Sequence, residues 1–245
     1  MQSIAGAAIA TLVLASIVVA VRLLALHRRS GAAPELLLGS MLLLCVGVGY
    51  PLMIAADRTS AERSVAFQLI ATLAINVGFS LLFEFTRRVF QPRAPWARAF
   101  AGAGAIVLLG TVVHRWTWFR THGAMRASDE PYAEMLLQTG PVAVAYLWTA
   151  WESLRYHALM RRRVKLGLAD AVVTNRFLVW GLMASCATAG VLLNLVAGAL
   201  RVNVFVSPTI LLASSCTGLG QTIGLVLAFV PPRPYTAWVR ARAAA

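Results

Sequence analysis

The chain has 245 residues, of which 59% are hydrophobic and 13% are charged, and its mean hydropathy is +0.73. Soluble domains carry about 45–50% apolar and about 25% charged residues, so this composition excludes a soluble globular protein and indicates an all-α integral membrane protein. The formal net charge of +13 would suggest nucleic-acid binding in a soluble protein, but the arginines stand at the ends of apolar segments, which favours a role in membrane topology and no nucleic-acid partner.

Seven apolar segments are each long enough to cross about 30 Å of hydrocarbon as a helix. They are predicted at residues 3–26, 34–56, 64–88, 97–118, 132–157, 176–198 and 206–230. The first segment lacks the basic start of a signal peptide, so we expect it to be retained. Together the seven predict one transmembrane bundle over residues 1–230. Residues 231–245 are expected to form a short cytoplasmic tail at the membrane interface.

The basic residues are distributed unevenly between the two sides of this predicted bundle. The connections after the first, third and fifth segments, with the C-terminal tail, hold 16 of the 22 lysine and arginine residues, and the other side holds 6. The positive-inside rule therefore places the N-terminus outside and the C-terminus in the cytoplasm. We expect a multi-pass protein of the inner (plasma) membrane, and the arginine- and alanine-rich composition suggests a bacterial source.

Polar side chains recur on one face of several segments, where they are costly unless they have partners. We predict a polar core shared by segments 64–88, 132–157, 176–198 and 206–230. Its residues are Asn76, Ser80, Glu84, Gln138, Glu152, Asn194 and Gln221. This core is either a ligand or ion pathway with the two glutamates at its charged end, or a set of interhelical hydrogen bonds worth about 0.6 kcal/mol each.

The connection between segments 132–157 and 176–198 is the longest on the cytoplasmic side. It combines a basic run with Asp170, which is placed to cap the helix that follows it. Its candidate docking residues are Arg161, Arg162, Arg163, Lys165, Asp170, Asn175 and Arg176. They would bind a cytoplasmic protein partner or clamp anionic lipid, and the alternative is an ordinary positive-inside anchor.

Several classes of active site are disfavoured by the positions of the reactive residues. Lys165, the one lysine, lies in a loop and cannot hold retinal in the last helix. The four histidines are split between the two sides, and the helical serines lie far from them in depth, so neither a metal or haem site nor serine catalysis is predicted. We therefore expect no cofactor and no metal, and an enzyme ranks below the three functional hypotheses that follow.

Three functional hypotheses remain open at the level of the sequence. The first is a sensor or receptor-like protein that binds a small apolar or amphipathic ligand in the polar core and signals through the basic loops. The second is a carrier for a small solute or lipid, with proton coupling through Glu84 or Glu152 as one form. The third is an accessory subunit of a larger membrane complex, which needs no ligand.

Overall fold

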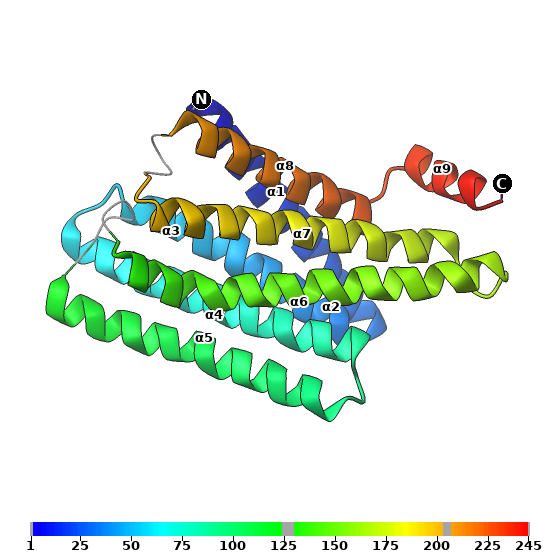
Figure 1. Ribbon diagram of the computed structural model, residues 1–245, viewed down its shortest axis with the longest axis horizontal. Helices are drawn as coiled ribbons and strands as arrows, with labels where there is room; N and C mark the ends of the chain where they lie inside the picture. The colour runs from blue at the N-terminus through cyan, green and yellow to red at the C-terminus, as the bar shows by residue number, and fades with distance from the viewer. Residues whose placement is uncertain (1, 124–129, 203–206, 245) are drawn as a thin grey trace.

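The computed structural model describes residues 2–123, 130–202 and 207–244, and all regular secondary structure in these ranges is helical. The long helices run side by side along one axis, and the C-terminal helix stands apart at one end (Figure 1). The elements in chain order are α1 (Gln2–Ser30), α2 (Ala33–Leu42), η1 (Leu43–Gly49), α3 (Tyr50–Ala56), α4 (Ala61–Phe90), α5 (Pro95–His122), α6 (Tyr132–Lys165), α7 (Ala171–Ala199), α8 (Pro208–Phe229) and α9 (Arg233–Ala244). The all-helical prediction is confirmed.

Six helices among the described residues are long and apolar enough to cross a membrane. They cover Gly6–Ser30, Ala33–Ala56, Ala61–Phe90, Pro95–His122, Ala171–Ala199 and Pro208–Phe229. Each coincides with a segment predicted from the sequence, so the chain is a multi-pass membrane protein. The remaining predicted segment, 132–157, lies within α6, which is helical throughout but is not one of these six.

The second span is one continuous helical run whose middle is wound as a π-helix. The π-helical segment η1 separates α2 from α3, and Pro51 follows it directly at the start of α3. Proline cannot donate the backbone hydrogen bond that an α-helix needs, and a π-helical turn lets neighbouring carbonyls find other donors. In η1 the buried Cys45 thiol donates to the Ile75 carbonyl of α4 at 3.3 Å.

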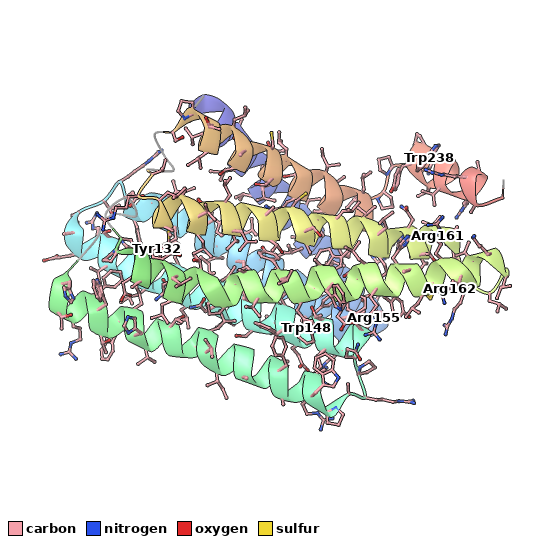
Figure 2. All side chains as sticks on the ribbon, in the orientation of Figure 1. Tyr132, Trp148, Arg155, Arg161, Arg162 and Trp238 are labelled. Atoms are coloured by element: carbon pink, nitrogen blue, oxygen red, sulfur yellow. The ribbon has the colours of Figure 1, made fainter. Side chains whose placement is uncertain are left out.

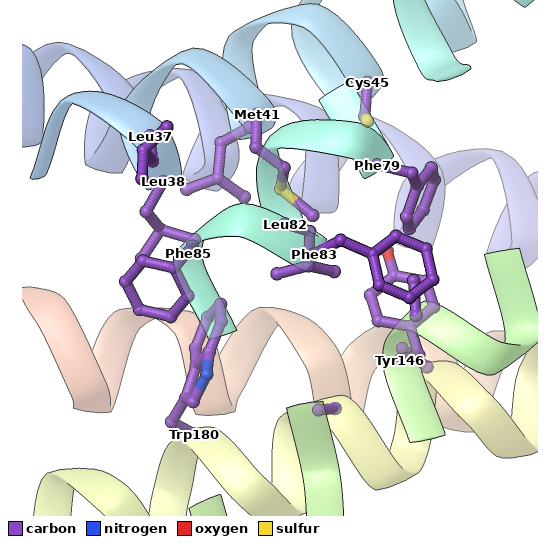
Figure 3. Packing of buried hydrophobic residues seen from close by; sticks show 14 of the residues in the cluster. Leu37, Leu38, Met41, Cys45, Phe79, Leu82, Phe83, Phe85, Tyr146 and Trp180 are labelled. Atoms are coloured by element: carbon purple, nitrogen blue, oxygen red, sulfur yellow. The ribbon is translucent and has the colours of Figure 1, made fainter. Parts of the chain in front are cut away.

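Helix α4 lies at the centre of the bundle, where it packs on α2, η1, α3, α5 and α6. Its buried side chains Phe79, Leu82 and Phe83 belong to one core cluster with Leu38 and Met41 of α2 (Figure 3). Aromatic rings tie α4 to its other neighbours, with the Phe79 and Tyr146 centroids 5.0 Å apart and those of Phe85 and Trp180 6.0 Å apart. These contacts fix α4 against both α6 and α7.

Helices α6 and α7 form a long antiparallel hairpin whose tip extends past the ends of α4 and α5 (Figure 1). The turn uses Gly167 at a φ of +70°, a conformation that glycine adopts without strain. Asp170 caps α7 as predicted, accepting the backbone N–H groups of Val172 at 2.6 Å and Val173 at 3.0 Å. Donation from Val173 and Val172, with the nearby Arg240 and Arg176 guanidinium groups, lowers the pKa of Asp170, so this cap stays charged at neutral pH.

Candidate functional site

Ionisable side chains gather where α4 begins, α5 ends and α6 begins; we call this end of the bundle the Arg115 end. Arg115 of α5 is buried and forms an ion pair with Glu130. Its guanidinium also donates to the Gln68 amide oxygen of α4 at 3.5 Å and stands 4.9 Å from the Phe119 ring centroid. Buried charge is costly in a membrane protein unless it is paired, and here the pairing joins three segments of the chain.

A second acid–base contact lies beside this ion pair. The imidazole Nε2 of His114 is 3.0 Å from both carboxylate oxygens of Glu134, which lies in the first turn of α6. Glu134 is largely buried, whereas the His114 side chain is 42% exposed and so remains accessible from outside the bundle. The contact therefore connects the accessible surface of α5 with the buried first turn of α6.

Two of the predicted core residues, Asn76 and Gln138, both hydrogen-bond to Thr111 of α5, which lies one helical turn before Arg115. Asn76 of α4 donates to the Thr111 hydroxyl at 2.8 Å, and Gln138 of α6 donates to the Thr111 carbonyl at 3.3 Å. Thr111 was not predicted, and α5 was not among the helices expected to share the polar core. The structure therefore brings the two amides to the same residue. Their meeting point is the α4–α5–α6 interface, whereas the predicted core included α7 and α8 and left out α5.

The two predicted glutamates lie near the opposite end of the bundle, in different settings. Glu152 is buried and accepts the Gln91 amide at 3.0 and 3.1 Å, and Arg155 lies 3.7 Å away. Glu84 is more exposed and pairs on its own helix with Arg87 at 2.6 Å and Arg88 at 2.5 Å. The predicted Glu–Arg pairs are present, and the structure records no shared contact between the two carboxylates within its described residues.

The remaining predicted core residues do not join these groups. Ser80 donates to the Asn76 carbonyl, and Asn194 donates to the Gly190 carbonyl, so both bond back to their own helices. Gln221 lies on α8, which packs on α7 and α1. The seven residues therefore do not form a single cluster in the described part of the chain.

An aromatic layer separates the polar groups of the two ends. Phe83 and Trp148 lie with their centroids 5.8 Å apart, and Phe100 of α5 packs edge-on against Trp148 at 5.0 Å. Together with the Phe79–Tyr146 pair, these rings fill the α4–α5–α6 interface between Asn76 and Glu152. Packed aromatic side chains thus separate Glu152 from the polar groups of the Arg115 end.

The predicted docking residues lie on the protruding tip of the α6–α7 hairpin, the hairpin end (Figure 2). Arg161, Arg162, Arg163, Lys165, Asp170 and Arg176 are exposed there. Asn175 is partly buried because its amide donates to the Tyr235 hydroxyl of α9 at 2.5 Å. His157 of α6 hydrogen-bonds the Thr174 carbonyl of α7 at 3.0 Å, which holds the two arms together beside Asn175.

The buried groups of the Arg115 end were not predicted from the sequence. Arg115 and His114 stood at the end of a predicted span and could be taken for ordinary boundary residues, and Glu130 lay in a predicted loop. The available signal was Glu130 just before an apolar segment and Glu134 at its start, combined with His114 and Arg115 near the end of the preceding segment. Opposite charges within two consecutive segments favour pairing across the turn that joins them.

Comparison of the chain with protein-family models, with curated proteins and with solved structures returns no match.

Proposed function

We propose that α6 also crosses the membrane, which makes the chain a seven-helix protein. The exposed face of α6 carries the large apolar side chains of Val144, Leu147 and Trp151, whereas Glu134 and Glu152 are buried. Polar residues that point into a bundle lower the hydropathy of a helix without exposing polar groups to lipid. The antiparallel packing of α6 along α7, which is apolar enough to span, further supports this assignment.

The proposed orientation places the Arg115 end outside and the hairpin end in the cytoplasm of a cell with an inner (plasma) membrane. Its support is the excess of lysine and arginine in the connections at the hairpin end. The short length of these connections matters, because the positive-inside rule is most reliable for short loops.

Single cysteines at the two ends of α6 test whether α6 crosses the membrane and which end lies outside. In a variant whose native cysteines are replaced by alanine, we expect Tyr132→Cys to react with a membrane-impermeant maleimide in intact cells. Leu168→Cys should react only after the membrane is permeabilised. Both positions have exposed side chains, so a difference in labelling reports sidedness. Equal labelling of the two in intact cells would show that α6 does not cross the membrane.

We infer that the protein is a sensor, which receives a small amphipathic ligand at the Arg115 end and signals through the hairpin end. The observation that carries this proposal is that α6 is one 34-residue helix with Glu134 in its first turn and the basic run in its last turns. A helix of this length extends about 50 Å, which is longer than the membrane is thick. A change at Glu134 can therefore reach the cytoplasmic tip through a single rigid element.

The Arg115 end has the properties of a receiving site. Its buried charges are expensive to maintain, and such residues in membrane spans commonly have functional roles. The His114–Glu134 contact is accessible at His114 and buried at Glu134, so a ligand with a polar head could replace it and pull on α6.

The test compares two histidines at the same end of the protein. We expect His114→Ala to change hydrogen–deuterium exchange at least threefold in peptides from residues 159–176, because it releases the first turn of α6. A small molecule that copurifies with the wild-type protein in mild detergent should be absent from native mass spectra of this variant. His122→Ala is the matched control, since His122 is exposed, stacks on Trp118 of its own helix at 4.0 Å and should change neither readout.

The sensor proposal would be contradicted if the folded His114→Ala variant showed unchanged hydrogen–deuterium exchange in residues 159–176. In that case a carrier is the second candidate, and one observation favours it. Two buried carboxylates of α6, Glu134 and Glu152, lie on opposite sides of the aromatic layer. Proton-coupled uptake into liposomes that Glu152→Gln abolishes would then identify the protein as a carrier.

A further inference from the structure

The hairpin end forms a compact basic surface from three helices; we call residues 159–176 together with α9 the hairpin platform. Its exposed cations are Arg161, Arg162, Arg163, Lys165, Arg176, Arg233, Arg240 and Arg242. Asp170 is the one acidic residue in these ranges. Within the described part of the chain, none of the eight cations forms an ion pair shorter than 4.0 Å. The platform therefore presents uncompensated positive charge.

Helix α9 is fixed to this surface by specific contacts. The Asn175–Tyr235 hydrogen bond joins it to α7, and Val239 is buried against the hairpin. Trp238 of α9 is exposed, with Tyr235 stacked beside it at 6.1 Å and the Arg242 guanidinium 5.4 Å from its ring centroid. A fixed aromatic residue flanked by arginine has the composition of the residues that contribute most to protein–protein binding.

Large apolar side chains are also exposed at the tip. Leu166 and Leu168 flank the Gly167 turn and are 72% and 74% exposed, and Val173 begins α7 beside them. Apolar side chains grouped within a charged surface mark protein-binding sites more often than nucleic-acid sites, which are dominated by polar and positive contacts. A second copy of the chain is a poor occupant, because two such platforms would repel each other.

The distance of the tip from the membrane distinguishes a protein partner from lipid. Helix α6 continues for 14 residues beyond the exposed Trp151 to end at Lys165, which corresponds to about 21 Å along the helix axis. The potential of anionic headgroups decays within a Debye length of about 8 Å at physiological ionic strength. With the cytoplasmic surface of the membrane placed at Trp151, the tip would lie beyond this range, which favours a protein partner over lipid at Leu166 and Leu168.

We propose that the hairpin platform docks a cytoplasmic protein with an acidic surface, which contacts the cations around an apolar centre made by Leu166, Leu168 and Trp238. This proposal rests on the orientation given above, and it identifies the output partner of the sensor. Long-range attraction between opposite charges would speed the encounter, and the apolar side chains would hold the complex.

Photo-cross-linking in cells of the native host tests the proposal with the full chain. We would place benzoylphenylalanine at position 168 or position 238 and identify the cross-linked species by mass spectrometry. The expected result is the same acidic protein at both positions, and no such product from position 147, which lies on the exposed apolar face of α6. Purified partner should then bind the protein in detergent, with affinity that falls as salt concentration rises.

Charge variants separate specific docking from chance proximity. Replacement of Arg161, Arg162 and Arg163 by glutamine should lower the cross-linking yield at least tenfold, whereas replacement of all three by lysine should preserve it. Products that contain only lipid, only nucleic acid or a second copy of the chain would overturn the proposal, as would the absence of any product. Because cross-linking needs no ligand, a docked partner combined with unchanged exchange in His114→Ala would contradict the sensor function alone.

Discussion

Arg115→Met should lower the free energy of unfolding in mixed micelles by about 3–5 kcal/mol, because breaking a buried ion pair leaves the other charge without a partner. The Arg115 side chain is only 4% exposed and Glu130 is 16% exposed, so water replaces the lost contact poorly. The substitution also removes donation to Gln68 and the approach to the Phe119 ring. Denaturation by sodium dodecyl sulfate, followed by tryptophan fluorescence, measures the change.

A double variant shows whether the loss comes from the unpaired charge. Arg115→Met combined with Glu130→Gln should be less destabilising than either single change, because no uncompensated charge then remains. Arg120→Ala is the matched control. Arg120 is exposed on the same helix and stands 5.2 Å from the Trp116 ring centroid, so its loss should cost less than about 1 kcal/mol. Additive effects in the double variant would rule out the ion pair as the cause.

The spans were predictable because apolarity over about 20 residues is a property of the chain itself and needs no knowledge of neighbouring helices. The same is true of the cap at Asp170, whose acceptors and donors lie within three residues of each other. The pairing of Glu84 with Arg87 and Arg88 also follows from spacing on one helix. Local chemistry of this kind is visible in the sequence.

The composition of the polar core was not predictable, because it depends on which helices are neighbours and on how each is rotated. Asn76 and Gln138 were predicted to share a core with residues of segments 176–198 and 206–230, yet both bond to Thr111 of α5. Gln221 shares a periodic polar face with other residues of its helix, but α8 packs on α7 and α1 instead of α4. Periodicity identifies the face that turns inward and leaves open what that face meets.

The α6 helix shows how composition can conceal a buried surface. Its polar residues Glu134, Gln138 and Glu152 make interior contacts with His114, Thr111 and Gln91, so the hydropathy of this part of α6 understates the apolar character of the face it exposes. The π-helical turn of η1 is a second feature that the sequence did not determine by itself. Pro51 indicated that backbone hydrogen bonding had to change, but the form of the change depends on the contact with α4.

The close contact between η1 and α4 leaves no room for a larger residue at Gly78. Gly78→Ala should destabilise the protein by about 1–3 kcal/mol or more, because it overpacks a site with no free space. A Cβ added at Gly78 would overlap the Cys45 Sγ, and it would lie 3.2 Å from the Met41 carbonyl oxygen and 3.4 Å from the Cys45 nitrogen. Moving the Cys45 side chain to another rotamer would relieve the Sγ overlap only at the cost of its hydrogen bond to Ile75, and the contact with the Met41 carbonyl oxygen would stay tight.

The companion substitution Cys45→Ala separates the side-chain overlap from the backbone overlap. It removes the Sγ atom, so the double variant Cys45→Ala, Gly78→Ala should recover part of the loss in apparent Tm while the backbone contacts keep it below that of Cys45→Ala alone. Gly102→Ala is the control, since nothing lies within 4 Å of its added Cβ and alanine favours a helix over glycine by about 1 kcal/mol. Its apparent Tm should stay level or rise. If Gly78→Ala behaved like Gly102→Ala, α4 and η1 could not be packed as closely as the Cys45–Ile75 contact requires.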